Sequence, residues 1–117
     1  MKQRIKGSVA VVLALAAAMY CSVAPSLAAS TCPSEPSLRS QSSTRATHIT
    51  FLNKRAGVIN VFWINYQGRR QFYRSLTPGQ TASFNTFATH PWVVTDAAGN
   101  CLGVHFADVG SDTVTIR

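Results

Sequence analysis

The sequence predicts an all-β protein, a seven-stranded antiparallel β-sandwich. After residue 47, short runs rich in β-branched and aromatic residues alternate with turn sequences such as Pro78-Gly79 and Gly99-Asn100. The runs recur every 8–12 residues or so, roughly the spacing of strands in a sandwich. No part of this region has the 3.6-residue period of an amphipathic helix. With 117 residues, the chain has room for one domain of this kind, predicted over 47–117.

Seven runs are the candidate strands. They are His48–Asn53, Val58–Tyr66, Arg70–Ser75, Thr81–Thr86, Pro91–Asp96, Cys101–Phe106 and Asp112–Ile116. Successive residues of a strand point to opposite faces, so alternation indicates which side chains face the core. On this basis we expect Ile49 and Phe51 to face the core in the first strand. Phe62 and Ile64 are expected to do so in the second strand, and Val93 in the fifth.

Residues 1–28 have the order of a secretory signal peptide. Basic residues precede an apolar run, 9–19, and small residues stand at 26 and 28, where signal peptidase requires them. The run is about half of the ~20 residues that a membrane-spanning helix needs, so no stable membrane anchor is expected. We expect cleavage after Ala28, with Ala29 as the second choice, and a secreted or periplasmic protein. The alternatives are a lipid anchor on Cys21, although Tyr20 before it is large for such a site, and an uncleaved anchor.

Residues 29–46 are predicted to form a disordered linker, because they are rich in Ser, Thr and Pro and hold almost no large apolar side chain. Only Cys32 and Cys101 remain after cleavage, and an even number of cysteines in an exported protein permits a disulfide. We therefore predict a Cys32–Cys101 bridge. Two unpaired thiols are the alternative.

The charge of the chain favours no nucleic-acid partner. Eleven basic and four acidic residues give a formal net charge of +7, and three of the basic residues belong to the signal, which leaves +4. The pairs Lys54-Arg55 and Arg69-Arg70 fall in predicted turns, where basic residues usually mark a solvated loop. The mature chain is therefore only moderately basic.

Several segments together resemble the β domain of the von Hippel-Lindau (VHL) family. They are Phe51-Leu52-Asn53, Val61 to Gly68 (VFWINYQG), Phe72-Tyr73, Leu76 to Gly79 (LTPG) and Asn85 to Trp92 (NTFATHPW). The resemblance spans roughly Thr47 to Asp108. It implies a seven-stranded sandwich with a pocket that accepts a hydroxylated proline from an extended peptide. It also implies that the peptide lies along the strand edge near Ser83–Phe87.

The resemblance places five ligand-binding residues in this sequence. They are Trp63, Tyr73, Thr86, His90 and Trp92. By this correspondence, Trp63 forms the aromatic floor of the pocket, while Tyr73 and Trp92 form its walls. Thr86, which stands where the family has a serine, and His90 bond the hydroxyl group of the ligand. The Tyr73 hydroxyl also helps to hold the peptide.

The sequence offers no clear catalytic machinery. The only acidic residues after the linker are Asp96, Asp108 and Asp112, and no two histidines have metal-ligand spacing. A pair such as Ser83 and His90 is found in most sequences and does not by itself indicate an enzyme. We therefore expect a binding protein that uses no cofactor or metal. The alternative is a structural or inhibitory sandwich in which the aromatic residues are merely core.

The partner expected from the sequence is an extended peptide or a protein that presents one, with proline or hydroxyproline as the anchor. The sequence ends at Arg117 without the helical domain through which the eukaryotic VHL protein recruits a ubiquitin ligase. Together with export, this leads us to expect no ubiquitin-ligase partner.

Overall fold

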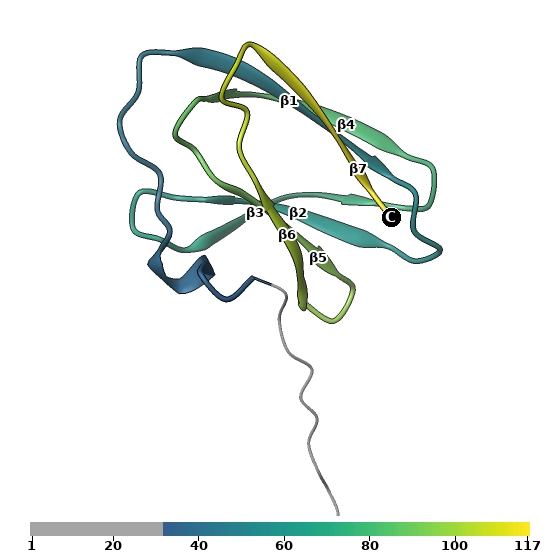
Figure 1. The fold of residues 1–117 in the computed structure, drawn as a ribbon. Coiled ribbons are helices and arrows are strands. Elements are labelled where there is room, and N and C mark those ends of the chain that lie inside the picture. Colours follow the sequence, from purple (N-terminus) through teal and green to yellow (C-terminus); the bar gives the residue numbers. More distant parts are fainter. Residues whose placement is uncertain (1–31) are drawn as a thin grey trace, which may run out of the picture.

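Two β-sheets pack face to face, as the sequence predicts. The computed structural model describes residues 32–117, so the predicted signal peptide, its cleavage site and Cys21 lie outside the described residues. The strands are β1 (Ala46–Asn53), β2 (Ile59–Ile64), β3 (Arg70–Leu76), β4 (Thr81–Phe87), β5 (Trp92–Asp96), β6 (Cys101–His105) and β7 (Ser111–Ile116). One sheet has the order β4-β1-β7 and the other β3-β2-β5-β6 (Figure 1). Within residues 32–117, no helix is long and apolar enough to cross a membrane.

One strand pair departs from the antiparallel pattern. β1 pairs antiparallel with β4 but parallel with β7, from His48 beside Ser111 to Asn53 beside Ile116. The chain crosses from β6 in the four-stranded sheet to β7 in the three-stranded sheet (Figure 1). After this crossing, β7 runs alongside β1 in the same direction. The expectation of a wholly antiparallel sandwich is therefore wrong at this pair, because residue patterns indicate strands but not their direction.

The main core lies between the two sheets. Its buried members are Ile49, Phe51, Ile59, Val61, Leu76, Ala82, Trp92, Val94, Ala107 and Ile116. At its centre Phe84 and Trp92 stack with their ring centroids 5.0 Å apart, and Phe51 lies 6.1 Å from Trp92. Offset aromatic pairs of this kind add to the stabilisation that burial gives. The expected core positions Ile49 and Phe51 are confirmed.

A second apolar cluster lies outside the sandwich core, on the outer face of the four-stranded sheet. Ile64 and Val93 are buried in it together with both described cysteines, and Phe62 packs against it. The expected face was therefore wrong for Phe62, Ile64 and Val93. The core side of β2 instead carries Val61, with Trp63 packed against the core. Alternation could not decide between the two faces because both are covered and apolar.

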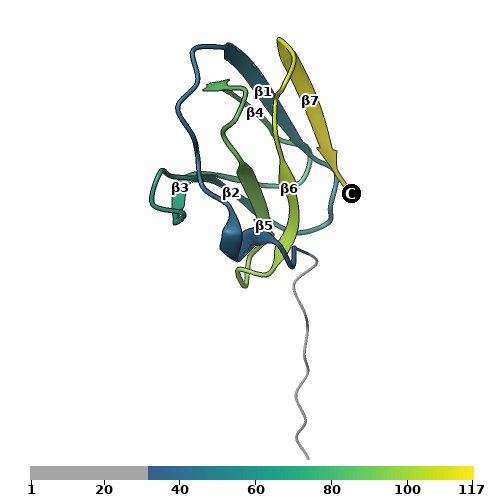
Figure 2. The same cartoon turned by 60° about the vertical axis from the view of Figure 1, so that its left-hand side comes forward.

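The cover of this outer face is residues 32–45, which we call the N-terminal strap (Figure 2). It contains a short 3₁₀ helix, Glu35–Ser37, and Ser40 is buried against the end of β2. The Ser40 N–H donates to the carbonyl of Asn65 at 3.1 Å, and its hydroxyl donates to the carbonyl of Ile64 at 2.6 Å. This part of the predicted linker is thus ordered. Composition did not reveal it, since the contacts use backbone groups and short polar side chains.

The strap is fastened at its start by the predicted disulfide. Cys32 is bonded to Cys101 at the beginning of β6, with a Cα–Cα distance of 5.9 Å. Nearby, the Arg70 guanidinium donates from Nε and from Nη2 to the two carboxylate oxygens of Glu35, at 2.6 and 2.8 Å. The two-point geometry makes this ion pair more specific than a single contact. The disulfide prediction is confirmed.

Candidate functional site

The five site residues named from the sequence lie around one cavity of about 180 Å³, which we call the aromatic slot. Its lining consists of Trp63, Tyr66, Tyr73, Asn85, Thr86, Phe87, His90 and Trp92. The structure therefore brings all five together, although they are spread over almost thirty positions of the chain. Their role in binding remains a prediction.

The slot forms where ends of both sheets meet. Trp63, on β2, pairs directly across the sheet with Trp92, the first residue of β5. Tyr73 comes from β3 at the edge of the same sheet, and Thr86 comes from β4 at the edge of the facing sheet. His90 lies in the connection from β4 to β5. Strands thus place four of the five side chains, and a short connection places the fifth.

Aromatic rings surround the slot largely edge to face. Tyr73 meets Trp92 at 4.9 Å between centroids with a 73° interplanar angle, and it meets Trp63 at 6.5 Å and 76°. The His90 ring lies 5.5 Å from Trp63. Edge-to-face contacts fix ring positions, because the positive edge of one ring faces the negative face of the next. The slot is therefore built from rings that hold one another.

The two expected walls differ in exposure. Tyr73 is 41% exposed, whereas Trp92 is only 2% exposed and stacks on Phe84 in the core. Trp92 therefore lies at the deep end of the slot, where it also belongs to the core, instead of forming an open wall. Trp63 is partly buried, as suits a floor. The aromatic lining is therefore open to solvent at Tyr73 and buried at Trp92.

Two buried polar side chains, Thr86 and His90, each 5% exposed, lie in the slot. The Trp92 indole Nε1–H donates to the Thr86 hydroxyl oxygen at 2.9 Å, which leaves the hydroxyl proton of Thr86 for another partner. His90 Nε2 lies 3.3 Å from the hydroxyl of Tyr66. These are the only side chains of the lining that are both polar and buried.

The ionisation of His90 sets what it can bond. Burial lowers the pKa of His90, and a hydrogen bond to the backbone of Gln41 opposes this with a smaller effect. A neutral ring has one N–H, and its other nitrogen is then an acceptor. Thr86 and His90 thus offer one donor and one acceptor, the complement of a hydroxyl group.

Three lining residues were not predicted from the sequence: Tyr66, Asn85 and Phe87. Tyr66 is 47% exposed and follows β2 in a turn closed by Asn65, whose side-chain oxygen accepts the N–H groups of Gln67 and Arg69. Asn65 and Gly68 are turn-forming residues, and they were the indication in the sequence that the strand ends before Tyr66.

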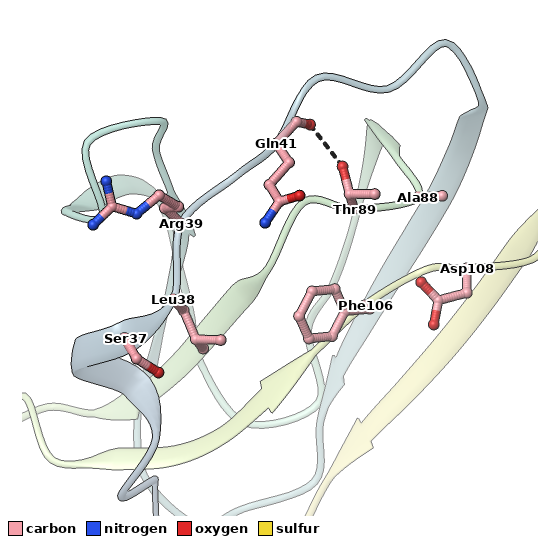
Figure 3. A pocket seen from close by; sticks show the side chains of 8 residues that line it. All are labelled: Ser37, Leu38, Arg39, Gln41, Ala88, Thr89, Phe106 and Asp108. Carbon is pink, nitrogen blue, oxygen red and sulfur yellow. Dashed lines mark hydrogen bonds between the residues drawn. The ribbon is translucent and has the colours of Figure 1, made fainter.

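A second, larger cavity of about 470 Å³ lies between the strap and the body of the domain (Figure 3). Its lining consists of Ser37, Leu38, Arg39, Gln41, Ala88, Thr89, Phe106 and Asp108. None of the predicted site residues lines it. Most of its polar side chains are exposed, so it lacks the buried donor and acceptor found in the aromatic slot.

Acid is expected to destabilise the protein through two histidines. Burial lowers the pKa values of His90 and His105, and the buried Nε2 of His105 has no hydrogen-bond partner among the described residues. Protons therefore bind more readily to the unfolded chain, in which a histidine has a pKa of about 6.5. The stabilisation is complete above this pH and is lost as the pH falls, by at most about 1.4 kcal/mol per pH unit and histidine.

Urea unfolding at pH 7.5 and 5.5 measures this effect. His105→Met replaces one titrating side chain with an apolar one. This should reduce the pH dependence of the free energy of unfolding. The carboxylate of Asp96, whose pKa is lowered mainly by Asn100, titrates below this window. Equal stability of the wild-type protein at the two pH values would contradict the prediction.

A comparison with protein families agrees with the fold. The family model of the VHL β domain matches residues 38–107. The match begins inside the strap, ends after β6 and contains all five predicted slot residues. Members of this family use the fold to bind peptide or protein substrates. The chain therefore belongs to the VHL β domain family.

Proposed function

We propose that this protein binds an extended peptide, takes one proline ring into the aromatic slot and prefers the hydroxylated ring. The observation that carries the proposal is the pairing of Thr86 and His90, which supply a buried donor and a buried acceptor beside the aromatic rings. A plain proline would leave the hydroxyl proton of Thr86 without a partner and would give His90 no acceptor or donor beyond the Tyr66 hydroxyl, and buried polar groups without partners weaken binding.

The size of the slot supports a single ring as the ligand. At about 180 Å³ it is smaller than the roughly 300–1,000 Å³ typical of pockets for drug-sized molecules. Its open side is formed by the exposed rings of Tyr66 and Tyr73. Aromatic faces of this kind pack well against the C–H groups of a proline ring.

Next to the slot, the outer edge of β4 pairs with no other strand of residues 32–117. β4 is an edge strand of its sheet, and β1 is its partner on the other side. The Ala88 N–H donates to the Arg45 carbonyl, and the Asn53 N–H donates to the Gln80 carbonyl. With the register of the pair, this means that the backbone N–H and C=O groups of even-numbered β4 residues point toward β1. By alternation, the backbone groups of Ser83 and Asn85 point away from the sheet. A peptide pairing there would run alongside Thr86 at the slot.

A purely structural sandwich is the second candidate function. The observation in its favour is Trp92, which is 2% exposed and behaves as a core residue. The exposed aromatic rings beside it are what this alternative leaves unexplained, since exposed aromatic side chains gathered at one cavity are typical of binding surfaces.

Two substitutions distinguish these functions. His90→Ala is expected to weaken the binding of hydroxyproline peptides by about 1–3 kcal/mol and to leave plain-proline peptides nearly unchanged, because only the former lose a hydrogen bond. Trp63→Ala should weaken both, since both rings pack on the indole. Calorimetric titration with paired peptides measures these effects.

Phe72→Ala is the control, because Phe72 is exposed on β3 and does not line the slot. Circular dichroism shows whether each variant remains folded. Absence of binding of either wild-type peptide at millimolar concentration would reject the proposed function in favour of the structural sandwich.

The proposal includes export. A disulfide is stable in oxidising compartments, and the Cys32–Cys101 bridge is compatible with one. The mature chain is expected to begin at Ala29 or Ser30, because Ala28 completes the small-residue cleavage pattern. N-terminal sequencing of the protein from the culture medium or periplasm measures this. Recovery of exported protein that begins at Met1 would reject it.

A further inference from the structure

We propose that Arg74, on β3, determines specificity beside the aromatic slot, and that the peptide it selects carries a carboxylate two residues away from the anchoring proline. The place of the carboxylate rests on the proposed function, because it is counted from the proline in the slot. Peptides that vary the proline and the carboxylate separately keep the two tests apart.

A β-bulge places Arg74 on the inner side of β3, next to Tyr73. Val61 of β2 lies opposite Arg74, whereas the next residue of β2 lies opposite Phe72, so Tyr73 is the extra residue of the bulge. Val61 is a buried core residue, and the side chains of directly opposed residues lie on the same face of a sheet. The bulge therefore lets two consecutive side chains, those of Tyr73 and Arg74, face the other sheet.

Both of these side chains meet Phe84 on the facing strand β4. The Tyr73 ring lies 5.5 Å from the Phe84 ring with an 89° interplanar angle, and the Arg74 guanidinium carbon lies 6.0 Å from the centre of the Phe84 ring. The face of an aromatic ring attracts a guanidinium group. The N–H groups of a guanidinium lie in its plane, so contact with a ring leaves them available to a carboxylate. Arg74 therefore presents a positioned cation between the edge strands β3 and β4.

Arg74 has no acidic partner among residues 32–117, where the one ion pair joins Arg70 to Glu35. None of the acidic residues of the chain belongs to β3 or β4; they are Glu35, Asp96, Asp108 and Asp112. Asp112 is on β7, which β1 separates from β4. The charge of Arg74 is therefore available to an acidic group of a bound peptide, and such complementarity favours association with acidic partners.

The alternation of β4 sets where the acidic residue stands in the peptide. Phe84 and Thr86 are two positions apart on the face of β4 that meets the other sheet, and Thr86 lines the slot. In a peptide paired with the outer edge of β4, side chains on one face are also two residues apart, about 7 Å along the strand. When the proline enters the slot beside Thr86, the next residue on that face lies beside Phe84 and Arg74. This residue is at position +2 if the peptide runs antiparallel to β4, and at −2 if it runs parallel.

Three variants and a set of peptides test this role. Arg74→Gln removes the charge and keeps a long polar side chain, whereas Arg74→Glu reverses the charge. Arg117→Gln is the matched control, because Arg117 is exposed and follows β7 at the end of the sheet opposite to Phe87. The peptides have hydroxyproline at the centre and Asp, Asn or Lys at position +2 or −2. Asp and Asn have nearly the same size, so their comparison isolates the charge.

Calorimetric titration gives the ratio of the Kd values of the Asn and Asp peptides. At one of the two positions, the wild-type protein should bind Asp roughly threefold more tightly than Asn, as suits a partly exposed ion pair. The ratio should fall to near one in Arg74→Gln and stay unchanged in Arg117→Gln. In Arg74→Glu, the Lys peptide should bind more tightly than the Asp peptide. Raising the ionic strength from about 0.01 to 1 M, which shortens the Debye length from about 30 to 3 Å, should reduce the wild-type ratio.

A wild-type ratio near one at both positions, or the same ratio in Arg74→Gln, would overturn the role of Arg74 even if hydroxyproline peptides bind well. Arg74 would then be a solvated side chain that only covers Phe84. If the Asp peptide binds equally well with alanine in place of the hydroxyproline, the proposed function fails and the role of Arg74 stands. If no peptide binds at millimolar concentration, both fail.

The Asn peptide and circular dichroism show whether the slot and the fold of Arg74→Gln are intact, because neither readout depends on the ion pair. Should Arg74→Gln also bind the Asn peptide less well, the charge-reversed variant decides. A damaged slot would weaken the binding of all peptides alike, whereas Arg74→Glu should favour Lys over Asp only if the side chain at 74 faces that residue of the peptide. Equal weakening of the Lys and Asp peptides would overturn the role of Arg74.

Discussion

Replacing Trp92 with alanine is expected to lower the free energy of unfolding by about 3–5 kcal/mol, the range seen when a buried large aromatic residue is removed. The indole is 2% exposed, stacks on Phe84 and lies 6.1 Å from Phe51. Its loss would leave a cavity between the two sheets, since rings on both sides are held by other contacts. Urea unfolding followed by circular dichroism measures the change.

Phe72→Ala is the matched control for this change, because Phe72 is 57% exposed on the edge strand β3. Its removal should cost no more than about 1 kcal/mol, as is usual for surface positions. A cost for Trp92→Ala as small as that of the control would show that the indole is not part of the core. The result also bears on function, because it measures how much Trp92, which lines the slot, contributes to the free energy of unfolding.

Breaking the Cys32–Cys101 disulfide is expected to lower the free energy of unfolding by about 4 kcal/mol. The bridge joins residues 69 apart in sequence, and the chain-entropy model gives roughly this value for a loop of that length. For a small sandwich this is a large share of the 5–15 kcal/mol or so by which folded proteins are usually stable. Denaturant titration with and without a dithiol reductant measures the effect.

The variant C32S/C101S provides the control, because the reductant should not change its stability. The reduced wild-type protein and this variant should unfold at similar urea concentrations. A change below about 1 kcal/mol on reduction would show that the unfolded chain gains little freedom when the bridge is lost, contrary to the entropy model.

The strands could be predicted from the sequence with small errors at their ends. The third candidate strand, for example, differs from β3 only in stopping one residue earlier. The largest error is in the second strand, which was expected to continue to Tyr66 but ends at Ile64. There the side chain of Asn65 accepts two backbone N–H groups and closes a turn, a local interaction that overrides the apolar pattern.

The slot residues could be named only because their order resembles a known family. Trp63 and Trp92 are ordinary core candidates by composition, and His90 would be taken for a loop residue. Their meeting depends on the register that sets Trp63 beside Trp92, and on the packing of the two sheets at β3 and β4. Tyr66 entered the slot through a turn, which is why strand patterns did not indicate it.

By itself the sequence determined the all-β class and the number of strands, and it predicted the pairing of Cys32 with Cys101 that the structure shows. The alternation of apolar residues, the turn residues and the number of cysteines can all be read from the sequence alone. Only the tertiary structure decided which face of β2 meets the core, since both faces are covered. It also showed that the strap is ordered. The position of the strap depends on a disulfide, a buried serine and backbone hydrogen bonds between residues distant in sequence. Such contacts leave no periodic or compositional trace, because any residue supplies a backbone carbonyl.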